Sequence, residues 1–295
     1  MRLIVTGAAG VLGSELIEQT PQAEIVAVTR QPQALTRRWQ GYANMKCCSW
    51  DELAQMPLAD GDVIVHGAFP RQENGQELTE ALDLTGTLLK KAGTSGKEIA
   101  WVDISSRSVY GQNEQTPWTE TAELMPASPY ALAKAAQELL TRQAAEAYGF
   151  RYTVLRMAGL IGVGMEARLV SQMTMRAIHD RALTVMGGEQ QFSMLDIRDA
   201  AAGIRALLRK EPTAWRPLYN FGAEQATRLK DIAPIIQKEA QRLYGWRGSI
   251  TQKRDAALID EMDSSLFYAQ MGWRPQYTLA DTVDWLLETY TGAAK

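Results

Sequence analysis

A glycine-rich turn close to the start of the chain constrains its fold more than any other feature. The apolar run Leu3–Thr6 leads directly into Gly7, further glycines stand at positions 10 and 13, and the helix-like segment Val11–Gln19 follows. A strand that ends in such a turn and opens a helix presents backbone amides to a pyrophosphate, and residues without a Cβ allow the close approach. The N-terminus is therefore predicted to bind a dinucleotide. The expected contacts are the loop residues Gly7, Ala9, Gly10, Val11, Leu12 and Gly13.

Short apolar runs alternate with helical patterns through the first half of the chain, which is typical of βαβ units. The expected strands are Leu3–Thr6, Glu24–Thr29, Met45–Ser49, Asp62–His66, Ile99–Ser105 and Tyr152–Arg156. The expected helices are Val11–Gln19, Pro32–Trp39, Gln76–Ala92 and Pro129–Tyr148. Because βαβ crossovers are right-handed and such strands are buried on both faces, the pattern predicts an α/β fold with a doubly wound parallel sheet of the Rossmann type.

The pattern loosens after Arg156, where a smaller lobe is expected. Glycines at positions 159, 162 and 164 mark a loop. Further helices are expected at Arg168–Arg181, Ala200–Arg209, Leu229–Tyr244 and Leu279–Tyr290, and strands at Gln191–Leu195 and Leu218–Phe221. We expect residues 1–160 to form an NAD(P)-binding domain and residues 161–295 to form mainly a C-terminal substrate-binding lobe. Segments near residues 190–222 are expected to return to the first domain.

The composition excludes several other classes of protein. The chain has 295 residues and a formal net charge of −3 with no block of like charge, so neither nucleic acid nor an anionic membrane is expected as a partner. Adjacent Cys47 and Cys48 are the only cysteines, too few for a metal cluster, and no metal site is expected. No secretory leader and no apolar run near ~18 residues is found, and the expected location is cytoplasmic.

Tyr130 and Lys134 are four residues apart in a segment predicted to be helical, so both side chains project from one face. Pro129 suits the first turn of that helix and Ser128 suits its N-cap. Oxidation or reduction at a carbinol carbon needs a group that takes up or delivers a proton as hydride moves. A phenol is a poor base near neutral pH, but an adjacent ammonium stabilises the phenolate. The pair is therefore predicted to be the acid/base centre.

Hydroxyl groups follow the predicted strand that begins at Ile99. Ser105, Ser106 and Ser108 stand at its carboxyl end, and ligands bind at this edge of parallel sheets. A serine in this place can hydrogen-bond the substrate oxygen and stabilise charge that develops on it. One of the three is therefore expected to join the acid/base pair.

The residue type at the end of the second predicted strand indicates which of the two nicotinamide cofactors is bound. An acidic residue there would bind a ribose 2′-hydroxyl, whereas here Ile25–Val28 is followed by Thr29 and Arg30, and the next acidic residue is Asp51. Arg30 offers a fork of donors to a 2′-phosphate, and Thr29 offers a hydroxyl. We therefore expect NADP(H), with NAD as the alternative, and Thr29, Arg30 and Asp51 among its contacts.

Together these motifs resemble the extended short-chain dehydrogenase/reductases, specifically the NAD(P)-dependent epimerase/dehydratase family, over nearly the whole chain. The segments that carry the resemblance are Thr6–Gly13 (T-G-x-x-G-x-x-G), His66–Ala68 (H-x-A), Ile104–Gly111 (S-S-x-x-V-Y-G), Pro126–Lys134 (P-x-S-P-Y-x-x-x-K), Ile197–Ala200 (V-x-D-V/A), Tyr219–Gly222 (Y-N-x-G) and Gly272–Pro275 (L-G-W-x-P). The resemblance implies that Ser106 is the catalytic and substrate-binding hydroxyl beside Tyr130 and Lys134. It also implies that Gly67 and Ala68 contact the cofactor, as do Tyr130 and Lys134.

A homodimer is a further implication of the resemblance. Family members pair through helices that match Gln76–Ala92 and Pro129–Tyr148, and the four helices form a bundle. The apolar residues available on these two segments are Leu78, Leu82, Leu88, Leu89, Leu132, Ala136, Leu139 and Leu140. Packing within the chain is the alternative use of these side chains.

Three positions depart from the family pattern. Asp83 replaces the Asn of the motif N-V-x-G-T. Gly159 and Phe192 stand where family sugar-nucleotide epimerases carry an Asn and an Arg that hold the nucleotide and its diphosphate. Both positions are expected to face the substrate, but a phenyl ring cannot replace a guanidinium as a phosphate ligand. Arg168 and Arg254 are candidate replacements for the missing arginine.

Three functions remain open at this point. The leading expectation is an NADP(H)-dependent oxidoreductase acting on a carbonyl or secondary alcohol of a small or sugar-like substrate, because the end of the second strand resembles that of NADP-dependent carbonyl reductases. One alternative is a sugar-nucleotide epimerase or dehydratase with bound NAD(P). Another is a catalytically silent dinucleotide-sensing protein, against which the presence of Ser106, Tyr130 and Lys134 together argues. If Tyr130 is not the acid/base, Asp103 or His66 is the next candidate.

Overall fold

The computed structural model describes residues 1–70, 74–111, 113–179, 182–246, 248–253 and 259–292. Its internal contacts divide the chain into two compact units. The first unit comprises Met1–Asn113, Ala122–Met157 and Ile204–Asn220, and the second comprises Glu114–Thr121, Ala158–Gly203 and Phe221–Lys295. The chain therefore leaves the first unit three times and returns to it twice.

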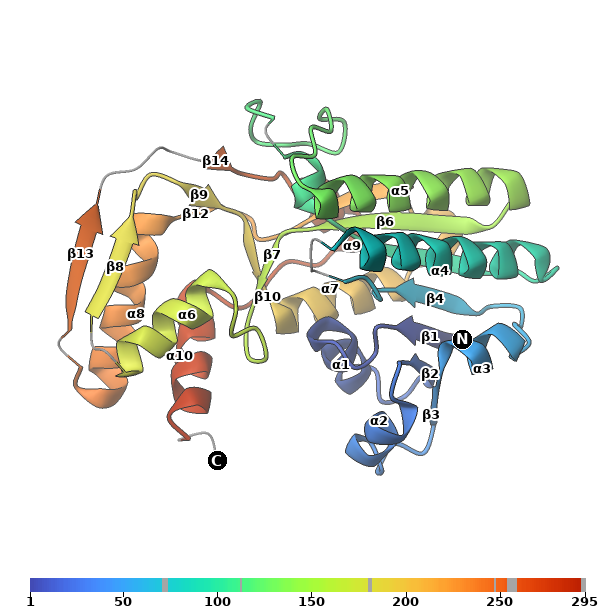
Figure 1. Ribbon diagram of the computed structural model, residues 1–295, viewed down its shortest axis with the longest axis horizontal. Helices are drawn as coiled ribbons and strands as arrows, with labels where there is room; N and C mark the ends of the chain where they lie inside the picture. The colour runs from blue at the N-terminus through green and yellow to red at the C-terminus, as the bar shows by residue number, and fades with distance from the viewer. Residues whose placement is uncertain (71–73, 112, 180–181, 247, 254–258, 293–295) are drawn as a thin grey trace. The chain divides into compact units, whose positions relative to one another are not determined.

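A seven-stranded sheet forms the centre of the first unit, in the order β11-β6-β5-β4-β1-β2-β3. Figure 1 labels five of its strands, β6, β4, β1, β2 and β3. Its strands are β1 (Arg2–Thr6), β2 (Glu24–Val28), β3 (Met45–Cys48), β4 (Val63–His66), β5 (Ala100–Ser106), β6 (Arg151–Met157) and β11 (Leu218–Phe221). Strands β1 to β6 pair in parallel, which confirms the predicted doubly wound fold. The strand order reverses between β1 and β4, and in open sheets this is where a ligand crevice forms.

Five α-helices connect strands β1 to β6 in succession. They are α1 (Val11–Glu18), α2 (Pro32–Arg38), α3 (Trp50–Gln55), α4 (Gly75–Thr94) and α5 (Pro129–Tyr148). Helices α4 and α5 lie side by side, and α5 also contacts β5 and β6 (Figure 1). The bounds of α5 follow from its sequence, because Ser128 caps the first turn by accepting from the Ala131 amide at 3.2 Å, Pro129 fills the first position and Gly149 ends the helix with φ +78°.

The second unit packs helices on small sheets of two or three strands rather than on one large sheet. Its elements are β7 (Gly159–Ile161), α6 (Leu169–His179), β8 (Ala182–Met186), β9 (Gln191–Phe192), β10 (Met194–Asp196), β12 (Thr227–Arg228), α8 (Leu229–Tyr244), β13 (Ser249–Lys253), β14 (Ile259–Asp260), α9 (Ser265–Met271) and α10 (Leu279–Tyr290). Helix α7 (Ile197–Leu208) begins in this unit and ends in the first. Fully buried Ile232, Ile236, Val283, Leu286 and Leu287 on α8 and α10 form the centre of its core.

Two sequence-based expectations for the second unit are wrong. Gly159 does not belong to a loop but begins β7, which pairs in parallel with β10. The predicted strand Gln191–Leu195 is two strands, because Ser193 interrupts it, and the Ser193 carbonyl accepts from the Gly159 amide at 3.0 Å. Strand β9 before the break pairs with β12 and β14, so the two halves have different partners. Among the helices in the described part of the chain, none is both long and apolar enough to cross a bilayer.

Candidate active site

The glycine loop leaves no room for side chains where it meets the first strands. Gly7 has φ +72°, and a Cβ added there would lie 2.9 Å from the backbone of Gly67 and Ala68. A Cβ on Gly13 would meet the Gly7 carbonyl oxygen at 2.4 Å. Gly10 is the N-cap of α1, so the free amides of the first helical turn stand directly behind the loop. This arrangement fits a dinucleotide pyrophosphate, because backbone rather than side chains lines the approach.

The end of β4 is tied to the glycine loop through a buried histidine. The Thr6 hydroxyl accepts from the Ala68 amide at 3.2 Å and lies 2.9 Å from His66 Nδ1, while His66 Nε2 lies 2.9 Å from the Thr85 hydroxyl of α4. Burial, assisted by the positive charge of Lys134, lowers the pKa of His66 to about 3. A ring that stays neutral and has both nitrogens in hydrogen bonds positions the loop, and it is not a proton carrier at neutral pH.

The residues expected to contact the cofactor ribose and its 2′-substituent follow strands β2 and β3. Thr29 is buried and its hydroxyl accepts from the Gln31 amide at 3.4 Å, whereas Arg30 is exposed. Asp51 lies in the first turn of α3, also exposed, behind a capping box formed by Ser49 and Glu52. These positions therefore follow the carboxyl ends of the adjacent strands β2 and β3, on the same edge as the glycine loop.

Tyr130 and Lys134 project from the first turns of α5, as their spacing predicts. Lys134 is 3% exposed, and its Nζ donates to the Ile104 carbonyl of β5 at 2.7 Å and to Gln137 Oε1 at 2.9 Å. Phe69, which follows β4, contacts both catalytic candidates. Its ring centroid lies 4.0 Å from Lys134 Nζ and 6.1 Å from the centroid of the Tyr130 ring, in an edge-on arrangement. The ammonium is therefore held by a carbonyl, an amide oxygen and an aromatic face.

Ser106 is the last residue of β5 and the N-cap of a short 3₁₀ helix, Arg107–Val109. Its hydroxyl accepts from the Ser108 amide at 3.2 Å and from the Ser108 hydroxyl at 3.0 Å. It is partly exposed, whereas Ser105 is buried and donates to Glu138 of α5 at 2.5 Å. Of the two adjacent serines, Ser106 is thus the one available at the carboxyl edge, and Ser105 belongs to the core beneath it.

A buried ionic network joins the end of β5 to α5 and β6. Arg156 donates to both Glu138 carboxylate oxygens, at 2.8 to 3.2 Å, and to the Tyr110 hydroxyl at 2.9 Å. The Tyr110 hydroxyl in turn donates to Asn220 of β11 at 2.5 Å. Burial opposes the charge on Arg156, but hydrogen bonding and attraction by Glu138 outweigh it and raise the pKa of the guanidinium. Because Ser105 and Tyr110 both belong to this network, it holds the backbone around Ser106 in place.

Gly159 and Phe192, expected to face the substrate, lie near each other in the second unit. The Gly159 amide bonds to Ser193, the neighbour of Phe192. The Phe192 side chain is partly buried and packs against the core of this unit. Arg168 stands directly before α6 with its amide bonded to the Met165 carbonyl at 2.9 Å, and Arg254 lies outside the described residues.

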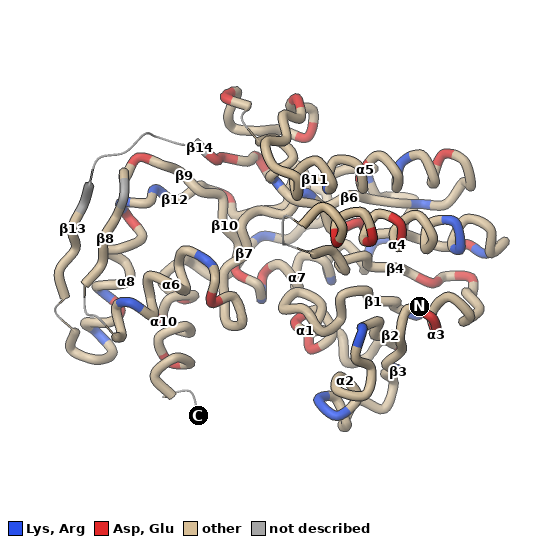
Figure 2. The backbone as a smooth tube through the Cα atoms, in the orientation of Figure 1, with Lys and Arg blue, Asp and Glu red and all other residues tan. Residues whose placement is uncertain are grey.

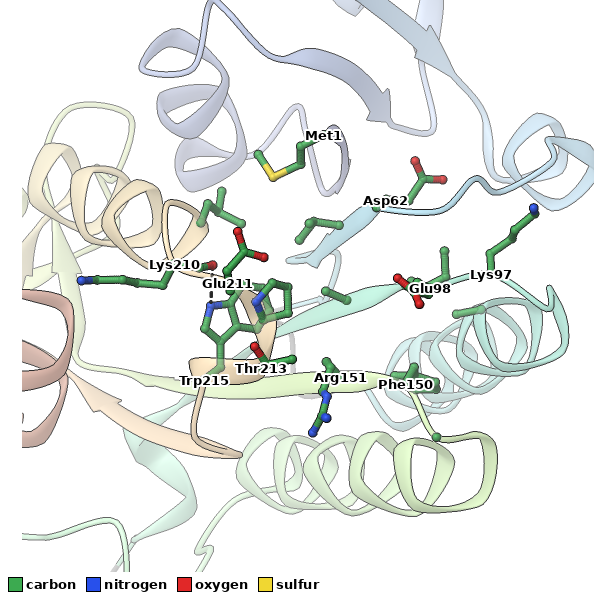
Figure 3. A pocket seen from close by; sticks show the side chains of 18 of the residues that line it. Met1, Asp62, Lys97, Glu98, Phe150, Arg151, Lys210, Glu211, Thr213 and Trp215 are labelled. Atoms are coloured by element: carbon green, nitrogen blue, oxygen red, sulfur yellow. Dashed lines mark hydrogen bonds between the residues drawn. The ribbon is translucent and has the colours of Figure 1, made fainter.

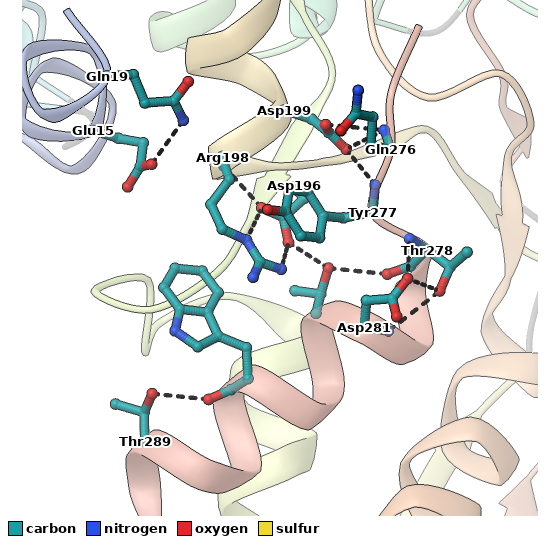
Figure 4. A network of polar contacts seen from close by, with 12 residues as sticks. Glu15, Gln19, Asp196, Arg198, Asp199, Gln276, Tyr277, Thr278, Asp281 and Thr289 are labelled. Carbon is teal, nitrogen blue, oxygen red and sulfur yellow. Dashed lines mark hydrogen bonds and ion pairs between the residues drawn. The ribbon is translucent and has the colours of Figure 1, made fainter. Parts of the chain in front are cut away.

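The motif that includes Ile197, Arg198 and Asp199 has a structural role in the second unit (Figure 4). The Arg198 guanidinium pairs with Asp196 at 2.7 Å and lies 3.6 Å from the centre of the Tyr277 ring. Asp199 accepts from the Gln276 amide at 3.0 Å and the Tyr277 amide at 2.8 Å. These contacts join two motifs that lie about 75 residues apart along the chain. The charges of Arg198 and Asp199 therefore stabilise the fold of the second unit.

A separate recess in the first unit, with a volume of about 660 Å³, lies at the opposite edge of the sheet (Figure 3). It is lined by residues at the amino ends of the strands, such as Met1 before β1 and Asp62 before β4, and by Trp215. Asp62 is already paired with Arg2 at 2.6 Å, and the Trp215 indole donates to the Leu207 carbonyl at 3.2 Å. Ligands of open α/β sheets bind at the carboxyl edge, so this recess is not assigned to the active site.

Two residues of the site, Phe69 and Gln137, are absent from the sequence-based predictions. Gln137 is three residues after Lys134, and this i, i+3 spacing places both on one helical face. A polar residue so close to a predicted catalytic lysine could have been recognised from spacing. Phe69 carries no comparable pattern, because an aromatic residue after a strand is ordinarily core.

Comparison with known proteins agrees with this geometry. The NAD dependent epimerase/dehydratase family model matches residues 3–222. A low-salt glycan biosynthesis protein of Haloferax volcanii is 25% identical, with 99% of both chains covered. A dTDP-glucose 4,6-dehydratase of Streptomyces griseus is also 25% identical, with 96% of this chain and 93% of the relative covered.

Solved structures share the fold over almost the full length. The dTDP-glucose 4,6-dehydratase DesIV of Streptomyces venezuelae, with NAD and TYD bound, superposes with a TM-score of 0.82 at 23% identity, covering 99% of this chain and 97% of that one. A UDP-glucuronic acid 4-epimerase of Bacillus cereus, in complex with UDP-glucuronic acid and NAD, superposes with a TM-score of 0.79 at 19% identity, covering 98% and 100%.

Proposed function

Because the chain belongs to the NAD-dependent epimerase/dehydratase family of enzymes, we propose that it oxidises and re-reduces a carbinol carbon of a nucleotide-activated sugar. The observation that carries this proposal is that Ser106, Tyr130 and Lys134 lie in the first unit, at the carboxyl ends of β5 and its neighbours. Relatives of the chain act on nucleotide sugars. The leading expectation from the sequence, a general carbonyl reductase, has weaker support from these relatives than the sugar-nucleotide alternative.

Each of the three side chains has a defined part in this reaction, and Lys134 has two. Tyr130 takes the proton of the sugar hydroxyl during oxidation and returns it during reduction. Lys134 stabilises the phenolate and binds the nicotinamide ribose, and Ser106 hydrogen-bonds the sugar oxygen. The cofactor, when bound along the glycine loop, supplies a reversible hydride acceptor. Return of the hydride to the other face of the carbon gives the epimer, with no net oxidation.

Epimerisation is the form of the reaction that these residues favour. Dehydration needs, beyond hydride transfer, a base for a carbon-bound proton and an acid for the departing hydroxide. The loop after β5 offers Arg107 and Ser108, and no carboxylate stands between Ile104 and Gly111. Glu138 and Asp103 are buried beneath the sheet edge in hydrogen bonds. The proposed net reaction is therefore inversion at one carbon.

The test is incubation with NAD⁺ or NADP⁺ and a panel of UDP- and dTDP-hexoses in D₂O, followed by proton NMR. Epimerisation should give a new anomeric signal with no deuterium at the inverted carbon, since the hydride never exchanges with solvent. Dehydration would place deuterium in a 4-keto-6-deoxy product. Steady consumption of NADPH with simple ketones, and no reaction of any nucleotide sugar, would overturn the proposal in favour of a carbonyl reductase.

NADP(H) is the proposed cofactor preference within this family, and it makes the first prediction. If exposed Arg30 contacts the 2′-phosphate, NADPH should bind more tightly than NADH, and Arg30→Ala should remove most of the difference. A charge-assisted hydrogen bond contributes roughly 1.5–3 kcal/mol, which corresponds to about a ten- to hundredfold loss of NADPH affinity. Fluorescence titration with both cofactors measures the difference in affinity, with Arg151→Ala, an exposed arginine at the amino end of β6, as the control. Equal affinities in the parent protein would exclude this role.

A homodimer is the proposed assembly, through α4 and α5. Leu132, Leu139 and Leu140 of α5 are 58%, 49% and 38% exposed. Leu78, Leu88 and Leu89, by contrast, are buried within the chain. The acidic residues of α4 gather in its first half and its lysines near its end, so an antiparallel second copy would bring opposite charges together (Figure 2).

Sedimentation should accordingly give twice the chain mass of 32.7 kDa. Leu139→Glu should convert the protein to a monomer with unchanged helicity, because the side chain is half exposed in the single chain and a carboxylate is costly only in a dry interface. Leu169→Glu, on the second unit, is the matched control and should remain a dimer. A parent protein that stays monomeric at every concentration would contradict the prediction.

A further inference from the structure

The side-chain amide of Gln137 lies between the Lys134 ammonium and the carboxylate of Asp103. Its oxygen accepts from Lys134 Nζ at 2.9 Å, and its nitrogen donates to Asp103 Oδ1. Thr141, one turn further along α5, donates to the other oxygen of Asp103 at 2.8 Å. Gln137, Thr141 and Asp103 are fully buried. Only one orientation of the amide satisfies both neighbours, because the reverse would set a donor against the ammonium and an acceptor against the carboxylate.

Asp103 is an unusual residue for its place in the fold. It stands in the middle of β5, whose other residues before the terminal serines are apolar, and a carboxylate buried there is costly unless it is paired. Burial raises the pKa of Asp103 to about 6, against the attraction of Lys134 and its hydrogen bonds. Above that pH the group is ionised, so Lys134 has a negative counter-charge one amide away.

The other charged groups around Asp103 are already committed to partners. Glu138 is paired with Arg156 at 2.8 Å. His66, the residue beside Asp103 on β4, is neutral and bonded to two threonines. Lys134 is therefore the charge to which the carboxylate is linked through Gln137.

We propose that Asp103 and Gln137 are positioning residues for Lys134, in which the carboxylate orients the amide and the amide holds the ammonium where it serves Tyr130 and the cofactor ribose. The inference rests on the proposed function, which assigns those two tasks to Lys134. Neither residue touches substrate or cofactor. Both act through the lysine, whose Nζ also bonds to the Ile104 carbonyl and so cannot move far without losing a partner.

A double-mutant cycle separates this role from a general structural one. The variants are Gln137→Met, Lys134→Met and the two combined, and the readout is the affinity for NADH and for NADPH, measured by fluorescence titration at neutral pH. Losing one hydrogen bond to the ammonium should weaken binding of the preferred cofactor by about three- to tenfold in the parent. In the Lys134→Met background the same substitution should have almost no effect. A merely structural role would give the same factor in both backgrounds.

Asp103→Asn provides an independent arm that keeps the size of the side chain. Without the negative counter-charge, the buried ammonium should lose its proton at lower pH. The fall of cofactor affinity on the alkaline side should therefore begin at lower pH than in the parent. The control is Thr153→Val on β6, which removes a buried hydroxyl that has no hydrogen-bond partner among the described residues. Its affinity and pH profile should match the parent.

The outcomes separate the role of Lys134 from the positioning role of Asp103 and Gln137. If Lys134→Met changes neither cofactor affinity nor turnover, the proposed role of Lys134 fails. If Lys134→Met weakens binding while Gln137→Met acts equally in both backgrounds, the positioning role alone is overturned. Should Gln137→Met not fold, an alkaline limb that is unmoved in Asp103→Asn overturns it instead.

Discussion

Tyr130→Phe is expected to lower turnover of a nucleotide sugar by ~10²–10⁴-fold while cofactor affinity hardly changes. The substitution keeps the aromatic ring, which packs edge-on against Phe69, and removes only the hydroxyl. Hydride transfer would then have to leave an unneutralised charge on the sugar oxygen. The glycine loop and Arg30, which are proposed to supply most of the cofactor contacts, are untouched.

The comparison variant is Lys134→Met, which is expected to behave differently from Tyr130→Phe. It should lower turnover and also weaken cofactor binding, because the same ammonium is proposed to serve both the phenolate and the ribose. Turnover is measured by NMR on a verified substrate, and affinity by titration with NADPH and NADH. Near-parental turnover of Tyr130→Phe would remove the tyrosine from the mechanism. Asp103 would not replace it readily, because it is buried and bonded to Gln137 and Thr141.

The nucleotide-binding half of the fold could be predicted closely from the sequence. The helix Pro129–Tyr148 was expected with the bounds that the structure has, because its cap, its proline and its terminal glycine are all local features. The strands are short apolar runs, and their parallel pairing follows from the crossover helices between them. Tyr130 and Lys134 lie on one helix, and the glycine loop joins two consecutive elements, β1 and α1, so the relative positions of these residues follow from local sequence.

The second unit was harder because its strands are short and their partners are distant. Ser249–Lys253 pairs with Ala182–Met186, more than sixty residues earlier, and neither segment alternates clearly enough to be recognised alone. The break at Ser193 depends on bonds to Asp260 and Met262, which no local pattern contains. Contacts of this kind arise from tertiary pairing, which overrides local propensity.

The catalytic surroundings show the same division between local and distant information. Tyr130 and Lys134 were predicted from one helical turn, whereas the contacts of Lys134 with Ile104 and Phe69 join three separate segments. The sequence indicated Asp103 only as an alternative acid/base to Tyr130. A carboxylate within an apolar run does not reveal which residues its side chain contacts. The structure instead places it behind the lysine, bonded through Gln137.

Arg156→Met should destabilise the protein by about 3–5 kcal/mol, because it leaves the Glu138 carboxylate buried without its counter-ion. Both side chains are about nine-tenths buried, at 6% and 10% exposure, and a bidentate contact joins them, with 3.1 Å from Nε to Oε1 and 2.8 Å from Nη2 to Oε2. The Ser105 hydroxyl would still donate to Glu138, but a neutral donor cannot offset a full charge in a dry site. The free energy of unfolding, from urea denaturation followed by far-ultraviolet circular dichroism, measures the loss.

The double variant Arg156→Met with Glu138→Met decides whether the loss comes from the stranded charge or from lost packing. Removing both charges should restore a large part of the stability, since apolar side chains of similar volume can replace a buried ion pair at little cost. Lys97→Met breaks an exposed pair with Asp60 in the same unit and should change stability little. If the double variant is as unstable as Arg156→Met alone, the network stabilises the fold through packing and hydrogen bonds rather than through the pairing of charges. In that case the hydrogen bond from Arg156 to Tyr110, which holds the backbone below Ser106, would be the part that matters.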